Sequence, residues 1–370
     1  MGQKLNTLYM GVFILLVAVG CNETQSRSSN DTDMPAYEVE ASWPQMLPNN
    51  WILGEVAGVE VDSRDHIWIA QRPTTLTDRQ AGAVQDPPIA LCCEPAPGVI
   101  EFDQDGNVVQ AWGGPSDEFD WTTQPHGIFI DHQDNVWIGG GFAEHQVLKF
   151  TRDGEFLMQI GDPNIRGGSN DTDLLGGPTD IVVDAETNEV YISDGYANRR
   201  VIVFDAETGE YLRHWGAYGD VPHDEPLGRY DPDAEPARQF RGPVHGIDIS
   251  NDGLVYVTDR GSNRVQVFRK DGEFVDEVFI RTETLSMGST WDVAFSEDPD
   301  QRWLYIPDGT NKVVWVVERS TLELKGSFGH GGKNAGYFGW LHSLDVDSRG
   351  NIYTGEVEAA KRAQKFVRTN

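Results

Sequence analysis

Gly127-Ile-Phe-Ile-Asp131 and Asn135-Val-Trp-Ile138 are followed by Gln146-Val-Leu-Lys-Phe150, Asp153-Gly154 and Glu155-Phe-Leu-Met-Gln-Ile-Gly161. Each apolar segment in this stretch is short, and polar or Asp-Gly turns separate the segments. Apolar side chains that recur with a period of two indicate β-strands, and Asp-Gly favours a tight turn between antiparallel strands. The stretch therefore predicts four short antiparallel strands.

The same unit recurs six times along the chain. Its first strands are Val59-Glu-Val-Asp62, Ile128-Phe-Ile-Asp131, Ile181-Val-Val-Asp184, Ile247-Asp-Ile-Ser250, Val293-Ala-Phe-Ser296 and Leu344-Asp-Val-Asp347. Its second strands carry Ile67-Trp68-Ile69, Val136-Trp137-Ile138, Val190-Tyr191-Ile192, Val255-Tyr256-Val257, Leu304-Tyr305-Ile306 and Ile352-Tyr353. Six repeats of four strands predict an all-β fold, a six-bladed β-propeller.

The last copy is one strand short, because it ends with Gln364-Lys-Phe-Val367. The segment Tyr37-Glu-Val-Glu-Ala-Ser-Trp43, ahead of the first copy, alternates like a strand. We expect this segment to supply the missing strand, which closes the ring and removes an exposed sheet edge. The propeller is then one domain, residues 35–370. Its repeats resemble NHL repeats.

Composition restricts the function. The 370 residues include 29 Lys and Arg against 59 Asp and Glu, a net charge of −30, which disfavours nucleic acid and anionic lipid as partners of the bulk surface. A hydrophobic content of 39% is enough for a packed core, and 40 Gly with 19 Pro indicate many turns. These values exclude a DNA-binding protein, a coiled coil and a multi-pass membrane protein.

The N-terminus resembles a lipoprotein signal peptide. Lys4 precedes an apolar run, Tyr9 to Gly20, that is about half the length needed to span a bilayer. Val17-Ala-Val-Gly-Cys21 resembles a bacterial lipobox, which implies cleavage after residues 1–20, lipidation of Cys21 and a flexible tether over 21–34. The protein is then exported and held on a bacterial membrane by its lipid anchor only. The alternative is an ordinary signal peptide with an incidental cysteine.

Two further cysteines, Cys92 and Cys93, are adjacent within a proline-rich insertion between Arg72 and Gly98. In an oxidising compartment they form either a vicinal disulfide or bonds to other molecules. The chain offers no CxxC spacing for a redox or zinc motif, so a structural or incidental role is favoured. The insertion is a candidate cap over the channel mouth.

Histidines recur at one position of the repeat. The residue two places before the first apolar residue of each first strand is, in blade order, Ala57, His126, Thr179, His245, Trp291 and His342. First strands line the channel of a propeller, so histidines on alternate blades lie about 120° apart around its axis. Three converging imidazoles supply three nitrogen ligands and leave a fourth position open, the pattern of a catalytic zinc site. Imidazole also suits copper, iron and nickel, and separate packing histidines are the alternative.

The loops after the second strands return to the same face of the ring. They place Arg72, Tyr196 and Arg260 there, with the two arginines at the same offset in their blades. Two guanidinium groups beside a metal suggest a substrate that carries a carboxylate. Tyr196, next to a cation, is expected to ionise below its usual pKa of about 10 and act as a base. The alternative is that the arginines pair with Asp between blades and that Tyr196 only packs.

The chain resembles the peptidylglycine α-amidating lyase (peptidylamidoglycolate lyase) family. Segments spread over the propeller carry the resemblance: Gln124-Pro-His-Gly-Ile128, Gly177-Pro-Thr-Asp-Ile181, Asp194-Gly-Tyr-Ala-Asn198, Gly242-Pro-Val-His-Gly-Ile247, Asp259-Arg260 and Trp340-Leu-His-Ser343. The resemblance implies a six-bladed propeller with zinc in its channel. It also implies cleavage of the C–N bond of a peptidyl-α-hydroxyglycine to an amide and glyoxylate.

The resemblance implies a role for each matching residue. His126, His245 and His342 would hold zinc, whose Lewis acidity favours the substrate alkoxide. Tyr196 would deprotonate the substrate hydroxyl. Arg72 would lie beside the reacting centre, and Arg260 near the substrate carboxylate.

One position departs from the family. An acidic residue that helps to hold a calcium ion follows the family's last histidine, and Ser343 stands there in this chain. Ser343 cannot supply the charge, so calcium does not carry over from the resemblance. Asp180 and Asp292 occupy the same offset in blades three and five.

Three functions remain open from sequence. The first is a metal-dependent lyase that acts on an N-acyl-α-hydroxyglycine-like substrate, or related metal chemistry on another small carboxylated substrate. The second is a non-catalytic NHL propeller that binds peptide, glycan or protein, since propellers serve many functions. The third, a gluconolactonase-type or streptogramin-lyase-type propeller, predicts different channel ligands. The histidine ring favours the lyase, and ring closure favours a monomer.

Overall fold

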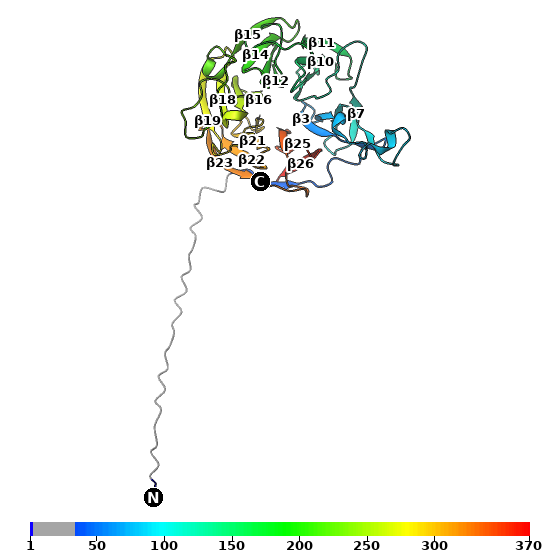
Figure 1. Cartoon of the computed structure of the whole chain (residues 1–370), viewed down its shortest axis with the longest axis vertical. Helices are drawn as coiled ribbons and strands as arrows, with labels where there is room; N and C mark the ends of the chain where they lie inside the picture. Colours follow the sequence, from blue (N-terminus) through cyan, green and yellow to red (C-terminus); the bar gives the residue numbers. More distant parts are fainter. Residues whose placement is uncertain (3–33) are drawn as a thin grey trace. The chain divides into compact units, whose positions relative to one another are not determined.

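Residues 1–2 and 34–370 are described by the computed structural model. Six four-stranded antiparallel sheets make up nearly all of its regular structure, and they follow one another around a ring (Figure 1). The predicted six-bladed β-propeller is therefore confirmed. The predicted signal peptide, Cys21 and all of the tether except Met34 lie outside the described residues. Within the described ranges, no helix has the length and apolar character needed to cross a membrane.

The strands of the first three blades follow the predicted repeats. They are β3 (Glu55–Val61), β4 (Ile67–Arg72), β6 (Val99–Phe102), β7 (Val108–Trp112), β8 (Ile128–Ile130), β9 (Val136–Gly139), β10 (Gln146–Phe150), β11 (Phe156–Gly161), β12 (Pro178–Asp184), β13 (Glu189–Asp194), β14 (Arg200–Asp205) and β15 (Tyr211–Trp215). A short parallel pair, β2 (Trp51–Ile52) and β5 (Glu94–Pro95), lies outside the blades.

The last three blades complete the ring. Their strands are β16 (Val244–Ile249), β17 (Leu254–Asp259), β18 (Arg264–Arg269), β19 (Phe274–Phe279), β20 (Ala294–Phe295), β21 (Trp303–Asp308), β22 (Val313–Glu318), β23 (Glu323–Phe328), β24 (Leu341–Val346), β25 (Ile352–Glu356), β26 (Arg362–Arg368) and β1 (Tyr37–Val39). Four single-turn 3₁₀ helices are η1 (Pro73–Thr75), η2 (Gly82–Val84), η3 (Ala217–Gly219) and η4 (Arg260–Ser262).

A hydrogen bond inside the blade explains why Asp so often directly follows the last residue of a first strand. The indole Nε1 of Trp68 donates to Asp62 Oδ2 at 3.0 Å, and Trp137 makes the same bond to Asp131 at 2.9 Å. The hydroxyl of Tyr353 donates to Asp347 at 3.1 Å. The buried ring thus keeps its polar atom satisfied, and the strand-end carboxylate fixes the ring within the blade.

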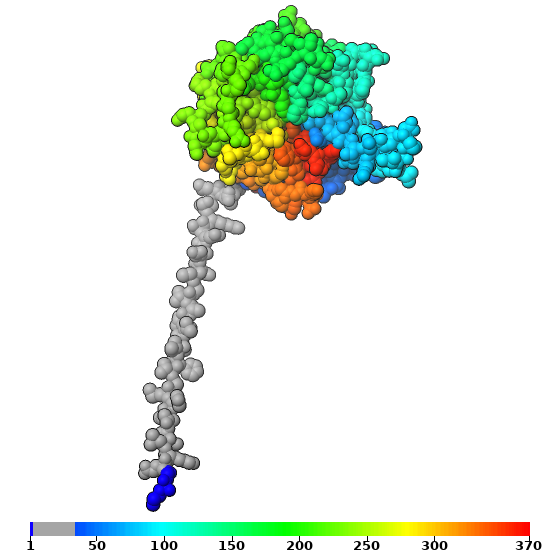
Figure 2. All heavy atoms as spheres, viewed as in Figure 1, coloured from blue at the N-terminus to red at the C-terminus, as the bar shows by residue number. Residues whose placement is uncertain are grey.

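The first and last parts of the ring are joined in one sheet. β1 pairs antiparallel with β26, with Tyr37 opposite Arg368 and Val39 opposite Phe366. This confirms the predicted closing strand, although pairing ends at Val39. Trp43 instead packs in the core, with its ring 5.0 Å from that of Tyr353. In Figure 2 the last residues (red) lie against the first blade (blue).

The insertion between Arg72 and Gly98 projects outward from the first blade in Figure 1, whereas a cap over the channel was expected. Its beginning stays at the ring, where Thr74 Oγ1 donates to Thr123 O at 3.1 Å. Its later part packs at the rim, where Asn50 Nδ2 donates to Leu91 O at 2.9 Å. Cys92 and Cys93 are joined in a vicinal disulfide.

Candidate metal centre and substrate site

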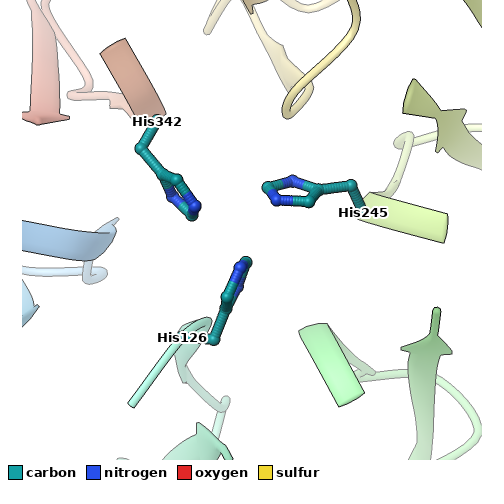
Figure 3. Close-up of side chains that lie close together, drawn as sticks. All are labelled: His126, His245 and His342. Atoms are coloured by element: carbon teal, nitrogen blue, oxygen red, sulfur yellow. The ribbon is translucent and has the colours of Figure 1, made fainter. Parts of the chain in front are cut away.

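Three histidines from three blades meet on the axis of the ring (Figure 3). The ring centroids of His126, His245 and His342 are 4.6 to 4.9 Å apart, and one ligand nitrogen of each lies within 4.8 Å of the others. All three side chains are buried. The structure therefore brings together the histidines that share one register in the sequence.

A backbone carbonyl fixes the tautomer of each imidazole. Nδ1 of His126 lies 2.7 Å from Thr179 O, Nδ1 of His342 lies 2.7 Å from Ala57 O, and Nδ1 of His245 contacts Trp291 O. A carbonyl oxygen only accepts, so each Nδ1 carries the proton and each Nε2 keeps its lone pair. The three carbonyls come from the same register in the neighbouring blades, so the repeat that places the histidines also orients them.

The ring nitrogens fit a metal ion. Burial, reinforced by the neighbouring cationic groups, lowers the pKa of all three imidazoles well below the ordinary value, so they are neutral ligands. Nε2 of His245 is buried and has no hydrogen-bond partner within the described part of the chain. A buried nitrogen without a partner costs free energy, and a bound cation removes that cost.

Tyr196 lies beside this ring. Its hydroxyl is 3.1 Å from Nε2 of His126, to which it donates because that nitrogen carries the lone pair. Burial raises the pKa of Tyr196 above its usual value, although the charges of Arg260 and Arg72 lower it. The sequence prediction of a lowered pKa is therefore wrong for the metal-free site, because loss of solvent outweighs the nearby cations.

Arg260 is a buried cation without a carboxylate partner among the described residues. Its side chain is only 4% exposed, its Nε has no hydrogen-bond partner, and its guanidinium lies 4.1 Å above the ring of Trp291. Burial lowers the pKa of Arg260, while a hydrogen bond with Tyr196 raises it. A desolvated guanidinium that stacks on an aromatic ring and lacks a counter-ion is suited to bind an anion.

Arg72 is partly neutralised by its strand partner. Its NH1 donates to Glu55 at 3.0 Å and its Nε to Pro125 O at 3.0 Å, whereas its NH2 is buried without a partner. The predicted alternative, that both arginines pair with Asp between blades, is not observed. Arg72 pairs with a Glu of its own blade and keeps one free donor.

Phe142 and Trp291 complete the walls of the site, and the sequence analysis missed their part. The ring of Phe142 stacks on Tyr196 at 4.2 Å, and that of Trp291 lies 5.4 Å from His245. Both could have been found from their positions in the sequence repeat. Phe142 follows the second-strand aromatic by five residues, as Tyr196 does, and Trp291 occupies the histidine register of blade five.

Five acidic side chains from five blades line the channel next to the histidines. These channel carboxylates surround a cavity of about 80 Å³ together with apolar residues of the first strands. Three accept a backbone N–H from the following blade: Asp180 from Ile247 at 3.1 Å, Asp292 from Leu344 at 3.3 Å, and Asp345 from Val61 at 2.6 Å. The channel carboxylates are Glu60, Asp180, Asp248, Asp292 and Asp345.

Two of the channel carboxylates reach the histidine ring. Asp180 and Asp292 line a smaller cavity, of about 20 Å³, together with the three imidazoles and Ser343. Ser343 brings no carboxyl group to this cavity, whereas Asp180 and Asp292 bring one each. The two aspartates that share one offset in blades three and five thus line the same cavity.

Burial raises the pKa of Asp180 and of Asp345 to about 7 each. Folded protein then holds protons that the unfolded chain has released above pH 4, so the stability that these two carboxyls contribute falls as the pH rises from about 4 to 7. The three buried imidazoles act in the opposite direction between about pH 5 and 6.5, because they stay neutral in the folded chain and take up protons when it unfolds. Comparison with Asp345→Asn isolates the carboxyl contribution. Between pH 5 and pH 8 we expect the Tm of the metal-free wild type to fall by a few °C relative to that of Asp345→Asn, and the exposed Glu207→Gln to follow the wild type. Calorimetry in chelator checks this, and an equal pH dependence of Tm in wild type and Asp345→Asn would contradict it.

The sequence comparisons agree with this architecture. The NHL repeat model matches residues 244–268, in blade four. Human NHL repeat-containing protein 3 is 26% identical over 92% of this chain and 86% of its own length. Peptidyl-alpha-hydroxyglycine alpha-amidating lyase 1 of Drosophila melanogaster is 26% identical over 90% of this chain and 60% of its length. Peptidyl-glycine alpha-amidating monooxygenase B of Xenopus laevis is 25% identical over 87% of this chain, which spans 34% of that protein.

A solved streptogramin B lyase has the same fold. The match covers 90% of this chain and 98% of the lyase chain, with a TM-score of 0.54. The sequence identity is 10%, so the similarity concerns the fold alone. The sequence relatives and the repeat model together carry the assignment. The chain is an NHL-type six-bladed β-propeller, homologous to the peptidyl-α-hydroxyglycine amidating lyases and to NHL repeat-containing protein 3.

Proposed function

We propose that this protein is a metal-dependent carbon–nitrogen lyase acting on an N-acyl-α-hydroxyglycine-like substrate. The substrate C–N bond breaks, the hydroxyl becomes the aldehyde of glyoxylate, and the nitrogen leaves as an amide after taking up a proton. One observation carries the proposal. Arg260, a buried cation without a carboxylate partner in the described chain, lies with Tyr196 beside three histidines whose ligand nitrogens are within 4.8 Å of one another.

His126, His245 and His342 would hold the metal, and a bound zinc ion would supply Lewis acidity toward the substrate hydroxyl. The carbonyl partners of their Nδ1 atoms keep the imidazoles oriented before a metal arrives. Three protein ligands would leave a coordination position open to substrate. A closed structural site would use a fourth side chain, and among the described residues no other His, Cys, Asp or Glu belongs to this cluster.

Tyr196 would act as the general base. Its hydroxyl is within 3.1 Å of an imidazole nitrogen, so a substrate hydroxyl bound at the histidine ring lies within its reach. Arg260 and Arg72 favour the phenolate that this role requires, because both charges lower the pKa of Tyr196 against the effect of burial. The proton that Tyr196 accepts can then pass to the departing amide nitrogen, which balances the reaction.

Arg260 would bind the substrate carboxylate, and Arg72 would orient the reacting centre through its free NH2. We expect Arg260→Ala to raise KM for an α-hydroxyglycine substrate by roughly 10²-fold, because a buried charge pair is lost. Steady-state kinetics measure this, with the exposed Arg269→Ala of the same blade as control. An unchanged KM in Arg260→Ala would show that the carboxylate binds elsewhere.

A direct assay tests the proposed activity. The purified protein is stripped with chelator, reloaded with zinc and given α-hydroxyhippurate, and glyoxylate is measured. We expect release that disappears with the chelator and returns with zinc. No release after zinc loading would favour the second candidate, a binding module. That candidate draws on the similarity over 92% of this chain to human NHL repeat-containing protein 3, whose name states no activity.

A further inference from the structure

A cavity of about 600 Å³ opens between the loops of blade six. Trp340, Gly339, Ala359 and Ala360 form the aromatic and aliphatic part of its lining, and Lys333, Glu358 and Arg362 add charged groups. Trp340 is two residues before His342, and the loop that carries both alanines follows β25. Both loops therefore lie at the channel mouth where Arg72, Tyr196 and Arg260 gather.

The lining is held in place by hydrogen bonds to a buried carboxylate. Glu356, fully buried, accepts the backbone N–H of Gly339 at 2.6 Å and that of Trp340 at 3.3 Å. Gln364 Nε2 donates to the same carboxylate at 2.9 Å. Lys312 Nζ lies 3.7 Å from the centroid of the Trp340 ring and donates to Gly309 O at 2.7 Å. A cation over the indole and a fixed backbone keep this wall oriented before a ligand binds.

An aromatic wall joins the cavity to the histidine ring. The indole of Trp340 lies 5.8 Å from that of Trp291, edge to face. Trp291 in turn lies 5.6 Å from the imidazole of His342 and stacks under Arg260. The two indoles thus form a continuous aromatic surface from Arg260 and the histidine ring to the cavity.

Resting on the proposed function, we propose that this cavity is the acyl subsite of the enzyme and binds an apolar aromatic or aliphatic N-acyl group. Arg260 takes the carboxylate at one end of the substrate, so the acyl group at the other end must leave the metal centre in another direction. The wall of Trp291 and Trp340 offers that direction. A volume of about 600 Å³ is typical of small-molecule pockets and exceeds the needs of an acetyl group.

Substrate length tests the subsite. We expect kcat/KM to be at least tenfold higher for N-benzoyl- than for N-acetyl-α-hydroxyglycine, because only the larger acyl group fills the cavity. Ala359→Trp, which fills the cavity from an exposed position, should remove most of this preference through KM and leave the acetyl substrate within about twofold. The matched control is Ala335→Trp, exposed on the loop before β24 and outside the lining. Equal preference in Ala359→Trp and wild type would overturn the subsite.

Binding of N-benzoylglycine, which lacks the hydroxyl and cannot react, separates this proposal from the lyase activity. Calorimetry on the zinc-loaded protein should show roughly tenfold weaker binding in both Ala359→Trp and Trp340→Ala, but not in Ala335→Trp. If no substrate yields glyoxylate but these losses occur, the subsite stands and the lyase activity fails. If glyoxylate forms but acyl size and both variants make no difference, the lyase stands and the subsite fails. No binding to wild type would also overturn the subsite.

Discussion

His245→Ala should release the bound transition metal and lower the rate of glyoxylate formation by several orders of magnitude. Nε2 of His245 has no protein partner among the described residues, and two imidazoles alone seldom retain zinc against chelator. The fold should persist, because β16 and β17 remain paired on both sides of this position. Elemental analysis gives the metal content, and circular dichroism gives the melting temperature.

The exposed His330→Ala is the control for the loss of an imidazole. It should keep about one zinc per chain and wild-type turnover. Stoichiometric metal in His245→Ala would refute the histidine ring as the metal site. Metal lost from both variants would place a ligand outside the ring.

Tyr196→Phe should lower kcat by about 10²- to 10⁴-fold without loss of metal. Phenylalanine preserves the stack on Phe142 but removes the hydroxyl that faces His126, so only the proton transfer is affected. Single-turnover kinetics on the zinc-loaded variant isolate the chemical step. Tyr211→Phe, which alters a hydroxyl on the outer strand of the same blade, is the control. A kcat for Tyr196→Phe within about threefold of wild type would remove Tyr196 from the role of base.

Much of this architecture could be predicted from the sequence because a repeat fixes positions in space. Once the blades were aligned, His126, His245 and His342 fell in one register, and the structure places them together. The same alignment placed Arg72 and Arg260 at one offset, and both lie at the channel mouth. The closing strand was predictable from the count of strands, since blade six lacked one.

Contacts between blades could not be predicted in the same way. The pKa of Tyr196 depends on how far Phe142 and its neighbours exclude water, which no register gives. Glu55 faces Arg72 because β3 and β4 are in a particular pairing register. The end of pairing at Val39 depends on the space that Trp43 finds between blades six and one. Each of these facts depends on side-chain packing rather than on repeat position.

The channel carboxylates could be predicted only in part: the sequence gives their position in the repeat but not their burial. Glu60, Asp248 and Asp345 share one position of the first strand, directly after its first apolar residue, in blades one, four and six. A search limited to metal-binding histidines passes over this pattern. The pattern alone does not give the raised pKa values of these carboxyls, because burial causes them. The same residues on an exposed outer strand would ionise normally.

The clasp between β1 and β26 also bears on how the protein is made. Ala36 N donates to Asn370 Oδ1 across a sequence separation of 334 residues, so the clasp joins one segment that is synthesised before the other five blades and one that is synthesised after them. Five blades can be assembled as they emerge, because their strands are neighbours in sequence. Blade six must wait for β26, and until then Tyr37 and Val39 lack their partners across the sheet. Completion of the ring therefore comes after synthesis of the five other blades, and until then the edge of β25 that pairs with β26 is open.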